Sequence, residues 1–292
     1  LGHDVYMLCV NVPGLKSDLK LNLREINQTE LFWGNHGFIY NASLWLKIRY
    51  SFVMNYRRLF CKGYYKCDDL YPAGLTRYVR KLQDEFNFDV CIVNYYWLTK
   101  VLESVSFRYT AINTHDVFAC RNILTDVDKP WMCTTREEEA KGLRRAKRIF
   151  ALQEEEGQYF KTIAPESDVS VVYCPYSVNT LPIADTHNLL MLSSSNTFNI
   201  KGFKWFCDSI YPSIMEAFPD VRLIVGGNIC SEFPEYAGQE NFLFIGRVED
   251  PAEIYRLGDI VINPCPSGTG LKIKTFEALS YGRIAMAHPH ST

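Results

Sequence analysis

Short, nearly continuous apolar runs alternate with amphipathic helical patterns along most of the chain, and this alternation constrains the fold more than any other feature. Such runs are typical of parallel strands that helices cover on both faces. Repeated strand–helix–strand units predict a doubly wound α/β sheet. The predicted strands are Asp4–Val10, Asp89–Asn94, Tyr109–Asn113, Arg148–Leu152, Val169–Cys174, Leu189–Ser193, Val221–Gly226, Phe242–Val248, Ile260–Pro264 and Ile284–Ala287.

The pattern runs through the chain twice, which predicts two domains of the same type. Its break falls at residues 179–187, NTLPIADTH, a polar stretch with a proline and no periodicity. We therefore expect one Rossmann-like domain over residues 1–178 and a second over residues 188–292. The sequence has no initiator methionine and enters a strand almost at once, so we allow for truncation of the fold at both ends.

The composition excludes several classes of function. The formal net charge is -2, so neither positive nor negative charge dominates, and we expect no nucleic-acid partner. No apolar run reaches the ~18–20 residues that a membrane span needs. The ten cysteines include no CxxC pair, which argues against a zinc or redox centre. Free thiols beside apolar runs indicate a reducing compartment, so we expect a cytoplasmic location.

Residues 11–72 follow the alternating pattern least well. They contain a basic and aromatic stretch, KIRYSFVMNYRRLFCKGYYKC, at Lys47–Cys67. A helix here would rest on an anionic membrane surface through residues 44–66, or cover an acceptor site, or pack into the core with a solvated basic edge. The first alternative places the protein at the cytoplasmic membrane surface.

The clearest candidate for ligand binding follows the predicted strand Ile260–Pro264. Open α/β sheets bind ligands beyond the carboxyl ends of their strands. This strand continues into CPSGTG, where two glycines let backbone N–H groups approach an anion, and the next helix adds its positive end. Alone, the stretch is equally consistent with a capped helix that carries a surface Lys–Glu pair.

Two faces of that predicted helix differ in character. The face expected to meet a ligand carries Gly270, Lys274, Glu277 and Tyr281. The neighbouring face, expected toward the core, carries Ile273, Phe276 and Ser280. Lys274 would then lie near phosphates, and Glu277 would accept hydrogen bonds from a ribose diol. Lys272 points away unless the first turn is irregular.

Arg247 directly follows a predicted strand and Gly246. The planar guanidinium group suits a diphosphate, whereas the alternative is a surface arginine paired with Glu249 or Asp250. A cation at a second strand end strengthens the interpretation of the glycine-rich stretch as a phosphate site.

These residues resemble a known family. The stretch GRVEDPAEIYRLGDIVINPCPSGTGLKIKTFEALSYG, residues 246–282, is similar to the donor-binding half of GT-B glycosyltransferases, close to family 4, the "glycosyl transferases group 1" type. Further similar stretches are Asn113–Phe118, Arg148–Glu156, Asn199–Phe206 and Pro219–Gly226. The resemblance covers residues 85–290 well and 1–10 loosely, but not 11–72.

The resemblance implies an α/β protein of GT-B architecture, with two Rossmann-like doubly wound domains that face each other across a cleft. It implies transfer of a sugar from a nucleoside diphosphate, such as a UDP-sugar, to a glycan, a lipid-linked saccharide or a protein. The second domain would hold this donor. Retention at the anomeric carbon is a further expectation from the family.

The resemblance also assigns roles to residues. Glu277 would hold the ribose, and Arg247 together with Lys274, or Lys272, would neutralise the diphosphate. His115 would touch the donor sugar near the reacting carbon; the alternative is a structural histidine with a helix-capping Asp116. Backbone amides would come from the donor loop, which consists of Gly268, Thr269, Gly270 and Leu271. At Thr269 the family usually has a glutamate.

Cleavage of the sugar–phosphate bond leaves negative charge on the diphosphate, which these cations and amides would stabilise. They can do the work of Mg²⁺, so we expect a metal-independent reaction with no cofactor beyond the donor substrate. Two alternatives stay open. One is a nucleotide-sugar epimerase on the same fold, which needs acid and base carboxylates that the sequence does not identify. The other is a non-catalytic nucleotide-sugar-binding or assembly subunit.

Overall fold

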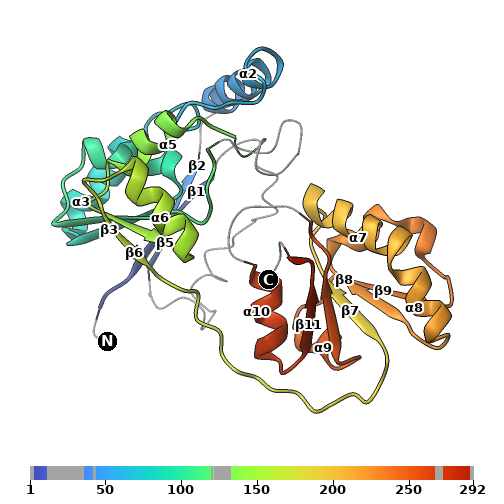
Figure 1. Cartoon of the computed structure of the whole chain (residues 1–292). Helices are drawn as coiled ribbons and strands as arrows, with labels where there is room; N and C mark the ends of the chain where they lie inside the picture. Colours follow the sequence, from blue (N-terminus) through green and yellow to red (C-terminus); the bar gives the residue numbers. More distant parts are fainter. Residues whose placement is uncertain are drawn as a thin grey trace. The chain divides into compact units, whose positions relative to one another are not determined.

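The computed structural model describes residues 3–11, 36–41, 44–119, 121, 133–266 and 272–289. The chain forms two compact units, of which the first ends at Val172 and the second begins at Tyr173 (Figure 1). The polar stretch 179–187, where the sequence predicts the boundary, lies along the second unit. The N–H of Asn179 donates to the carbonyl of Ser280 at 2.8 Å.

The first unit contains two parallel sheets. One pairs β1 (Tyr6–Asn11) with β2 (His36–Asn41), a strand that the sequence did not predict. The other is hydrogen-bonded in chain order and consists of β3 (Val90–Asn94), β4 (Tyr109–Asn113), β5 (Arg148–Ala151) and β6 (Asp168–Val171). Its helical elements are α2 (Leu44–Phe60), α3 (Leu75–Phe86), the 3₁₀ helix η1 (Tyr96–Glu103), α5 (Arg136–Leu143) and α6 (Glu154–Ile163).

One face of this four-stranded sheet forms the core of the unit. Ile112 and Ile149 of adjacent strands are fully buried there, together with Phe160 of α6. On the opposite face of β3, Val90 and Ile92 are 52% and 55% exposed. Ala111 of β4, the ladder partner of Ile92 on this face, is 5% exposed, so among the described residues the face is open at the edge strand β3 and covered at β4.

The second unit has one five-stranded parallel sheet with the order β11-β10-β7-β8-β9 (Figure 1). Its strands are β7 (Leu189–Leu192), β8 (Leu223–Gly226), β9 (Phe242–Gly246), β10 (Ile260–Asn263) and β11 (Ile284–Ala287). Its helices are α7 (Thr197–Ser209), α8 (Tyr211–Ala217), α9 (Ala252–Tyr255) and α10 (Ile273–Ser280), with the 3₁₀ turns η2 (Asn228–Glu232) and η3 (Pro234–Tyr236).

Both faces of this second sheet are covered, as its apolar runs predict. Successive residues of β7 point to opposite sides, because side chains alternate along a strand. Met191 packs with Phe203 of α7, whereas Leu190 packs with Ile254 of α9 and Ala278 of α10. No helix in the described part of either unit is long and apolar enough to cross a membrane.

Helix α7 approaches the carboxyl end of β10 most closely at Gly202. A Cβ atom at this position would lie 2.8 Å from the carbonyl oxygen of Pro264 and 3.0 Å from Cα of Cys265. Both neighbours are backbone atoms, which cannot swing away as a side chain can. The absence of a side chain therefore lets the start of α7 lie over the end of β10.

We expect Gly202→Ala to destabilise the protein by about 1–3 kcal/mol, because overpacking against backbone outweighs the ~1 kcal/mol gain in helix propensity. Ser209→Ala, on an exposed position of the same helix, is the control, with an expected change within about 0.5 kcal/mol. Urea unfolding measures both values. Equal stability of Gly202→Ala and the wild type would contradict the close approach.

Candidate functional site

The direction of winding reverses between β7 and β10, which are neighbours in the second sheet. The chain moves from β7 outward to β8 and β9, and then returns to β10 and β11 on the other side. Open α/β sheets bind ligands beyond their carboxyl ends at such a reversal. Ser193 follows β7 directly, and Cys265 follows β10. The sheet topology alone therefore indicates that these two residues lie where a ligand would bind.

A buried polar cluster joins the two strand ends. The Nζ of Lys274 donates to Oγ of Ser193 at 2.8 Å and to Oδ1 of Asn199 at 2.5 Å. The thiol of Cys265 donates to the same Oδ1 at 3.1 Å. The Nδ2 of Asn199 donates to the backbone oxygen of Ser194 at 2.9 Å. The side-chain oxygen of Asn199 therefore faces the lysine.

Lys274 is a cation held by neutral oxygen atoms. Burial lowers the pKa of this lysine, while Cys265 and Glu277 nearby act in the opposite direction. A half-buried ammonium group that is stabilised only in part by its surroundings is well suited to bind an anion. The sequence predicted Lys274 at the site, but not Ser193 and Asn199. The position of Ser193 at the end of a predicted strand was the available signal.

Glu277 lies one turn further along α10. Its Oε1 accepts a hydrogen bond of 2.8 Å from the hydroxyl of Tyr255, which is 1% exposed. The ring of Tyr255 stacks on Tyr281 at a centroid distance of 4.7 Å. Burial and the adjacent Glu277 raise the pKa of Tyr255, so its hydroxyl remains a donor. Tyr255 thus orients the carboxylate, a role that the sequence did not reveal.

The outward face of α10 differs from the prediction. Ile273 and Phe276, expected toward the core, are 52% and 44% exposed, whereas Ser280 is buried. Helix α10 begins only at Ile273, after the glycines from which the predicted helical faces were counted. Lys272 immediately precedes it. The predicted donor loop, Gly268, Thr269, Gly270 and Leu271, lies outside the described residues.

Arg247 does not join the Lys274 cluster. It follows β9, and β8 lies between β9 and β7, so its strand end is about 10 Å, at ~4.8 Å per strand, from the end of β7 where Ser193 accepts from Lys274. Arg247 is exposed, and among the described residues no carboxylate forms an ion pair with it. The predicted alternative, a pairing with Glu249 or Asp250, is therefore not found.

In the first unit, His115 follows β4 with a left-handed backbone, at φ 64. Its Nε2 lies 2.7 Å from Oδ1 of Asn94, and the Nδ2 of Asn113 donates to the same oxygen at 3.3 Å. Since that oxygen is an acceptor, Nε2 of the ring carries the proton. The lone pair of a neutral imidazole is then on Nδ1.

The surroundings of His115 favour its neutral form. Burial lowers its pKa, and Asp116 acts in the opposite direction. The ring stacks on Tyr95 at a centroid distance of 4.5 Å, and Tyr95 also has a left-handed backbone, at φ 69. Asp116 pairs with Arg121 at 2.5 Å. Two strained residues at adjacent strand ends are a frequent property of functional sites.

A buried carboxylate holds the loop that follows His115. Glu139 of α5 is 1% exposed and accepts hydrogen bonds from the N–H groups of Phe118 and Ala119 at 2.7 and 3.2 Å. The hydroxyl of Tyr159 donates to it at 3.1 Å. Burial raises the pKa of Glu139 to about 7, although these hydrogen bonds favour the ionised form.

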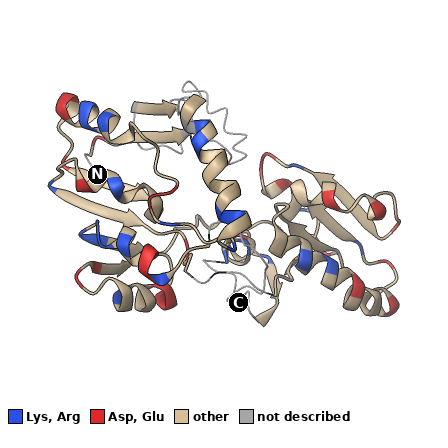
Figure 2. Cartoon of the chain, turned by 90° about the horizontal axis from the view of Figure 1, so that it is seen from above, with Lys and Arg blue, Asp and Glu red and all other residues tan. Residues whose placement is uncertain are grey.

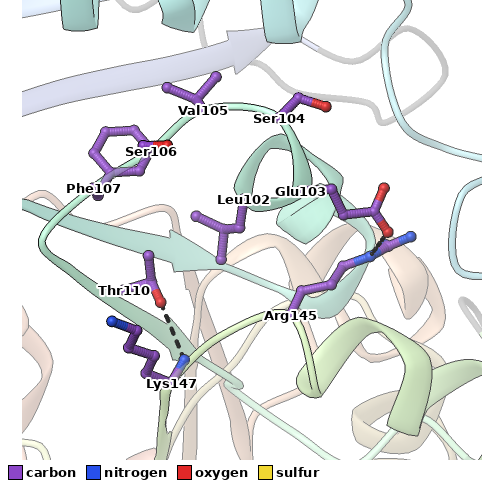
Figure 3. A pocket seen from close by; sticks show the side chains of 9 residues that line it. All are labelled: Leu102, Glu103, Ser104, Val105, Ser106, Phe107, Thr110, Arg145 and Lys147. Carbon is purple, nitrogen blue, oxygen red and sulfur yellow. Dashed lines mark hydrogen bonds and ion pairs between the residues drawn. The ribbon is translucent and has the colours of Figure 1, made fainter.

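A hollow of about 340 Å³ lies at the amino-terminal edge of the four-stranded sheet in the first unit, opposite the edge that carries His115 (Figure 3). Its most prominent cation, Arg145, is bound to Glu103 at 2.7 Å and to Asp68 at 2.7 Å. Thr110 and Lys147 line it at the start of β4 and β5. Because parallel sheets bind ligands at their carboxyl edge, this hollow has no part in the site.

No group of three or more His, Cys, Asp or Glu within the described ranges could hold a metal ion. The sequence does contain an Asp-x-Asp triplet, Asp126-Val127-Asp128, in residues that the structure does not describe. The expectation of a metal-independent reaction therefore depends on the cations alone.

Comparisons with known proteins bear on the family resemblance and on the fold. Residues 186–291 match the family described as "Glycosyl transferases group 1". Anabaena HepE in complex with UDP and glucose superposes with a TM-score of 0.60 at 13% identity, over 98% of this chain and 80% of that one. The chain has the GT-B fold. The predicted GT-B architecture is confirmed, and so is the resemblance to group 1 glycosyltransferases, over residues 186–291.

Other similar proteins are longer than this chain. Staphylococcus aureus TarM has a TM-score of 0.58 at 10% identity, over 74% of this chain and 45% of TarM. Sucrose-phosphate synthase from Thermosynechococcus elongatus has 0.58 at 14%, over 73% and 59%. A Klebsiella pneumoniae protein, described as an uncharacterized 44.6 kDa protein in the cps region, is 27% identical over 32% of this chain and 28% of its own length. The chain thus spans about a quarter to three fifths of these relatives.

The pKa of Glu139 predicts a specific pH dependence of stability. Its rise from 4.5 to about 7 means that the folded state binds the proton more tightly than the unfolded state. The free energy of unfolding should therefore fall by about 3 kcal/mol as the pH rises from 4.5 to 7, at ~1.4 kcal/mol per pKa unit.

Urea unfolding between pH 5 and 8 should show this decline in the wild type and a flatter profile in Glu139→Gln. Glu240→Gln, an exposed position, serves as the control and should retain the wild-type profile. Parallel profiles for the wild type and Glu139→Gln would contradict a raised pKa at this residue.

Proposed function

We propose that the chain is a glycosyltransferase that moves a sugar from a nucleoside diphosphate, such as UDP, to an acceptor. The observation that carries the proposal is the half-buried Lys274 ammonium, which donates to the neutral Ser193 and Asn199 where the winding of the sheet reverses. Its place corresponds to the site where open α/β sheets bind nucleotides. The group 1 match over residues 186–291 and the UDP-bound structure of HepE support the same reaction class.

The proposed roles combine the local geometry of each unit with the resemblance to group 1 glycosyltransferases. Lys274 stabilises the negative charge that develops on the leaving diphosphate, assisted by the amides of residues 268–271 and by Arg247. Glu277, oriented by Tyr255, accepts hydrogen bonds from the ribose diol. His115 offers Nδ1 as an acceptor to a hydroxyl of the donor sugar. The proposed donor-binding set also includes Gly268, Thr269, Gly270, Leu271 and Lys272.

The proposed reaction is retaining and metal-independent. In a front-face route, the acceptor hydroxyl forms the new bond to the anomeric carbon, the sugar–phosphate bond breaks, and the hydroxyl proton passes to the leaving phosphate. This route needs no separate base.

The epimerase alternative would need acid and base carboxylates. The carboxylate with the most strongly raised pKa among the described residues is that of Glu139, which is 1% exposed and accepts hydrogen bonds from three donors. It does not suit an acid–base role, so nothing favours the epimerase alternative.

A non-catalytic nucleotide-sugar-binding subunit is the second candidate, because the geometry described concerns the binding of a donor. Incubation of the protein with UDP- and GDP-sugars and acceptor extracts separates the two. Release of free nucleotide that depends on the extract supports transfer. Tight binding of a nucleotide sugar without any release would favour the subunit.

The acceptor in our proposal is a glycan, a lipid-linked saccharide or a protein, and the location is cytoplasmic, at the membrane surface. Helix α2 supports contact with that surface through residues 44–66, since it carries Lys47, Arg49, Arg57 and Arg58 and no acidic residue. An acceptor attached to a lipid would then be close to the first unit.

Lys274→Met should weaken the binding of UDP about 10- to 100-fold, because a charge-assisted contact to a phosphate is worth ~1.5–3 kcal/mol. Lys204→Met, at an exposed lysine of α7, is the matched control and should bind as the wild type does. Isothermal titration calorimetry measures the affinity, and circular dichroism checks the fold. Arg247→Ala should also weaken binding. Near-normal affinity in both Lys274→Met and Arg247→Ala would refute the proposed phosphate site.

Tyr255→Phe removes the hydroxyl that orients Glu277 and preserves the stacked ring. We expect UDP to bind more weakly, by about 10- to 100-fold, on the basis of one lost hydrogen bond to a charged group, worth ~1.5–3 kcal/mol. The affinity for 2′-deoxy-UDP, which lacks one of the hydroxyls at issue, should change less. An equal loss for both nucleotides would count against the ribose as the partner of Glu277.

A further inference from the structure

One side of α2 is a continuous apolar surface exposed to solvent. Its large side chains are between 47% and 81% exposed, in a protein whose other large apolar residues are mostly buried. They are Leu44, Trp45, Ile48, Phe52, Tyr56, Leu59 and Phe60. Exposed apolar patches of this size on a folded protein mark sites of interaction.

The opposite side of α2 is fixed to the first unit, so this surface is not the result of a freely rotating helix. Tyr50 is 8% exposed and belongs to the main core of the unit, and Met54 packs against that core. Arg57 donates to Asp69 at 2.7 Å and ties the last turn to the following segment. The exposed side chains therefore face away from the unit that holds the helix.

The apolar side chains form an ordered row. Leu44, Ile48, Phe52 and Tyr56 follow one another at intervals of four residues, which places them along one stripe of the helix. The rings of Phe52 and Tyr56 stack at a centroid distance of 6.5 Å, and Tyr56 meets Phe60 at 5.3 Å. At 100° per residue, the whole row spans an arc of about 160°.

Basic residues border this row on one flank and enter it on the other. Lys47 and Arg58 project on one flank, whereas Arg49 lies within the apolar arc, about 20° from its other edge, and all three are exposed. Helix α2 contains no acidic residue, and its basic residues are visible toward its two ends (Figure 2). An apolar face bordered by lysine and arginine is the pattern of helices that lie in the interface of an anionic membrane.

We propose that this face of α2 binds the surface of anionic phospholipid bilayers. The apolar row enters the boundary between headgroups and acyl chains, and Lys47, Arg49 and Arg58 contact the lipid phosphates. A second copy of the chain is a poorer occupant, because two such faces would bring their cations together without any acidic partner on the helix. The proposal extends the membrane contact given under the proposed function and does not depend on sugar transfer.

Co-sedimentation with vesicles tests this proposal in the full chain. We expect binding to phosphatidylcholine vesicles that contain phosphatidylglycerol, weaker binding to phosphatidylcholine alone, and loss of the difference at high salt. The double variant Phe52→Ser/Leu59→Ser should lower the partition coefficient at least about tenfold, since partition follows the buried apolar area. Val178→Ser/Ile183→Ser, at residues 78% and 80% exposed in the second unit, is the matched control and should bind normally.

Trp45 reports on insertion directly, because it is 81% exposed in the free protein. A blue shift of tryptophan fluorescence should appear with phosphatidylglycerol vesicles and disappear in Trp45→Phe. Absence of vesicle binding, or equal binding by Phe52→Ser/Leu59→Ser and the wild type, would overturn the proposal. So would a concentration-dependent dimer that the same substitutions abolish, because it would identify a second copy as the occupant.

The binding of UDP keeps the two proposals separate. The α2 variants should bind UDP as the wild type does, because α2 and the Lys274 cluster belong to different units. Vesicle binding without UDP binding would refute the proposed function alone, and UDP binding without vesicle binding would refute only the role of α2.

Discussion

The pairing of β7 with β10 is the constraint on which the second unit depends. These strands are far apart in the sequence, yet Ile260 lies opposite Leu189 in the parallel ladder. Their adjacency brings Ser193 and Cys265 to one edge of the sheet and places α7 and α10 over that edge. The polar cluster around Asn199 joins residues from both of these helices. Without the reversal of winding, the lysine would have no buried partners.

The two units use different means to prepare a polar side chain for a ligand. In the second unit, a half-buried cation donates to neutral oxygen atoms, which fix its position without neutralising it. In the first unit, an amide fixes the protonated nitrogen of His115, and a buried carboxylate holds the loop after it. Both arrangements fix the geometry before any ligand arrives, which reduces the cost of ordering the site upon binding.

Much of the fold could be predicted from the sequence, because long apolar runs report strands directly. Each predicted strand is present, and Tyr109–Asn113 and Ile284–Ala287 have the predicted ends. The strand β2 was missed because its sequence, HGFIYN, is short and lies where the alternation is weakest. The exposure of one face of β3 could not be predicted, because an apolar run such as VCIVN does not indicate whether its strand lies at the edge or in the middle of a sheet.

The site could be predicted only in part. Lys274 and Glu277 were found because they stand four and seven residues after a glycine that follows a strand, and spacing of that kind is visible in a sequence. Their partners Asn199 and Tyr255 come from other helices, and no local pattern shows which distant side chain an amide or a hydroxyl will meet. Arg247 is one strand earlier in the chain but, in the sheet, is separated from β10 by two strands, a distinction that depends on topology.

The order of strands also bears on how the two units reach their native state. The larger sheet of the first unit pairs each strand with the next one along the chain, so its contacts form between near neighbours in sequence. The ladder between β7 and β10 joins strands whose paired residues, such as Leu189 and Ile260, are far apart in the sequence, so more chain entropy opposes its formation. Chains rich in distant contacts fold more slowly than those rich in local ones. The edge of the sheet that carries Lys274 is therefore expected to be among the last parts of the molecule to form.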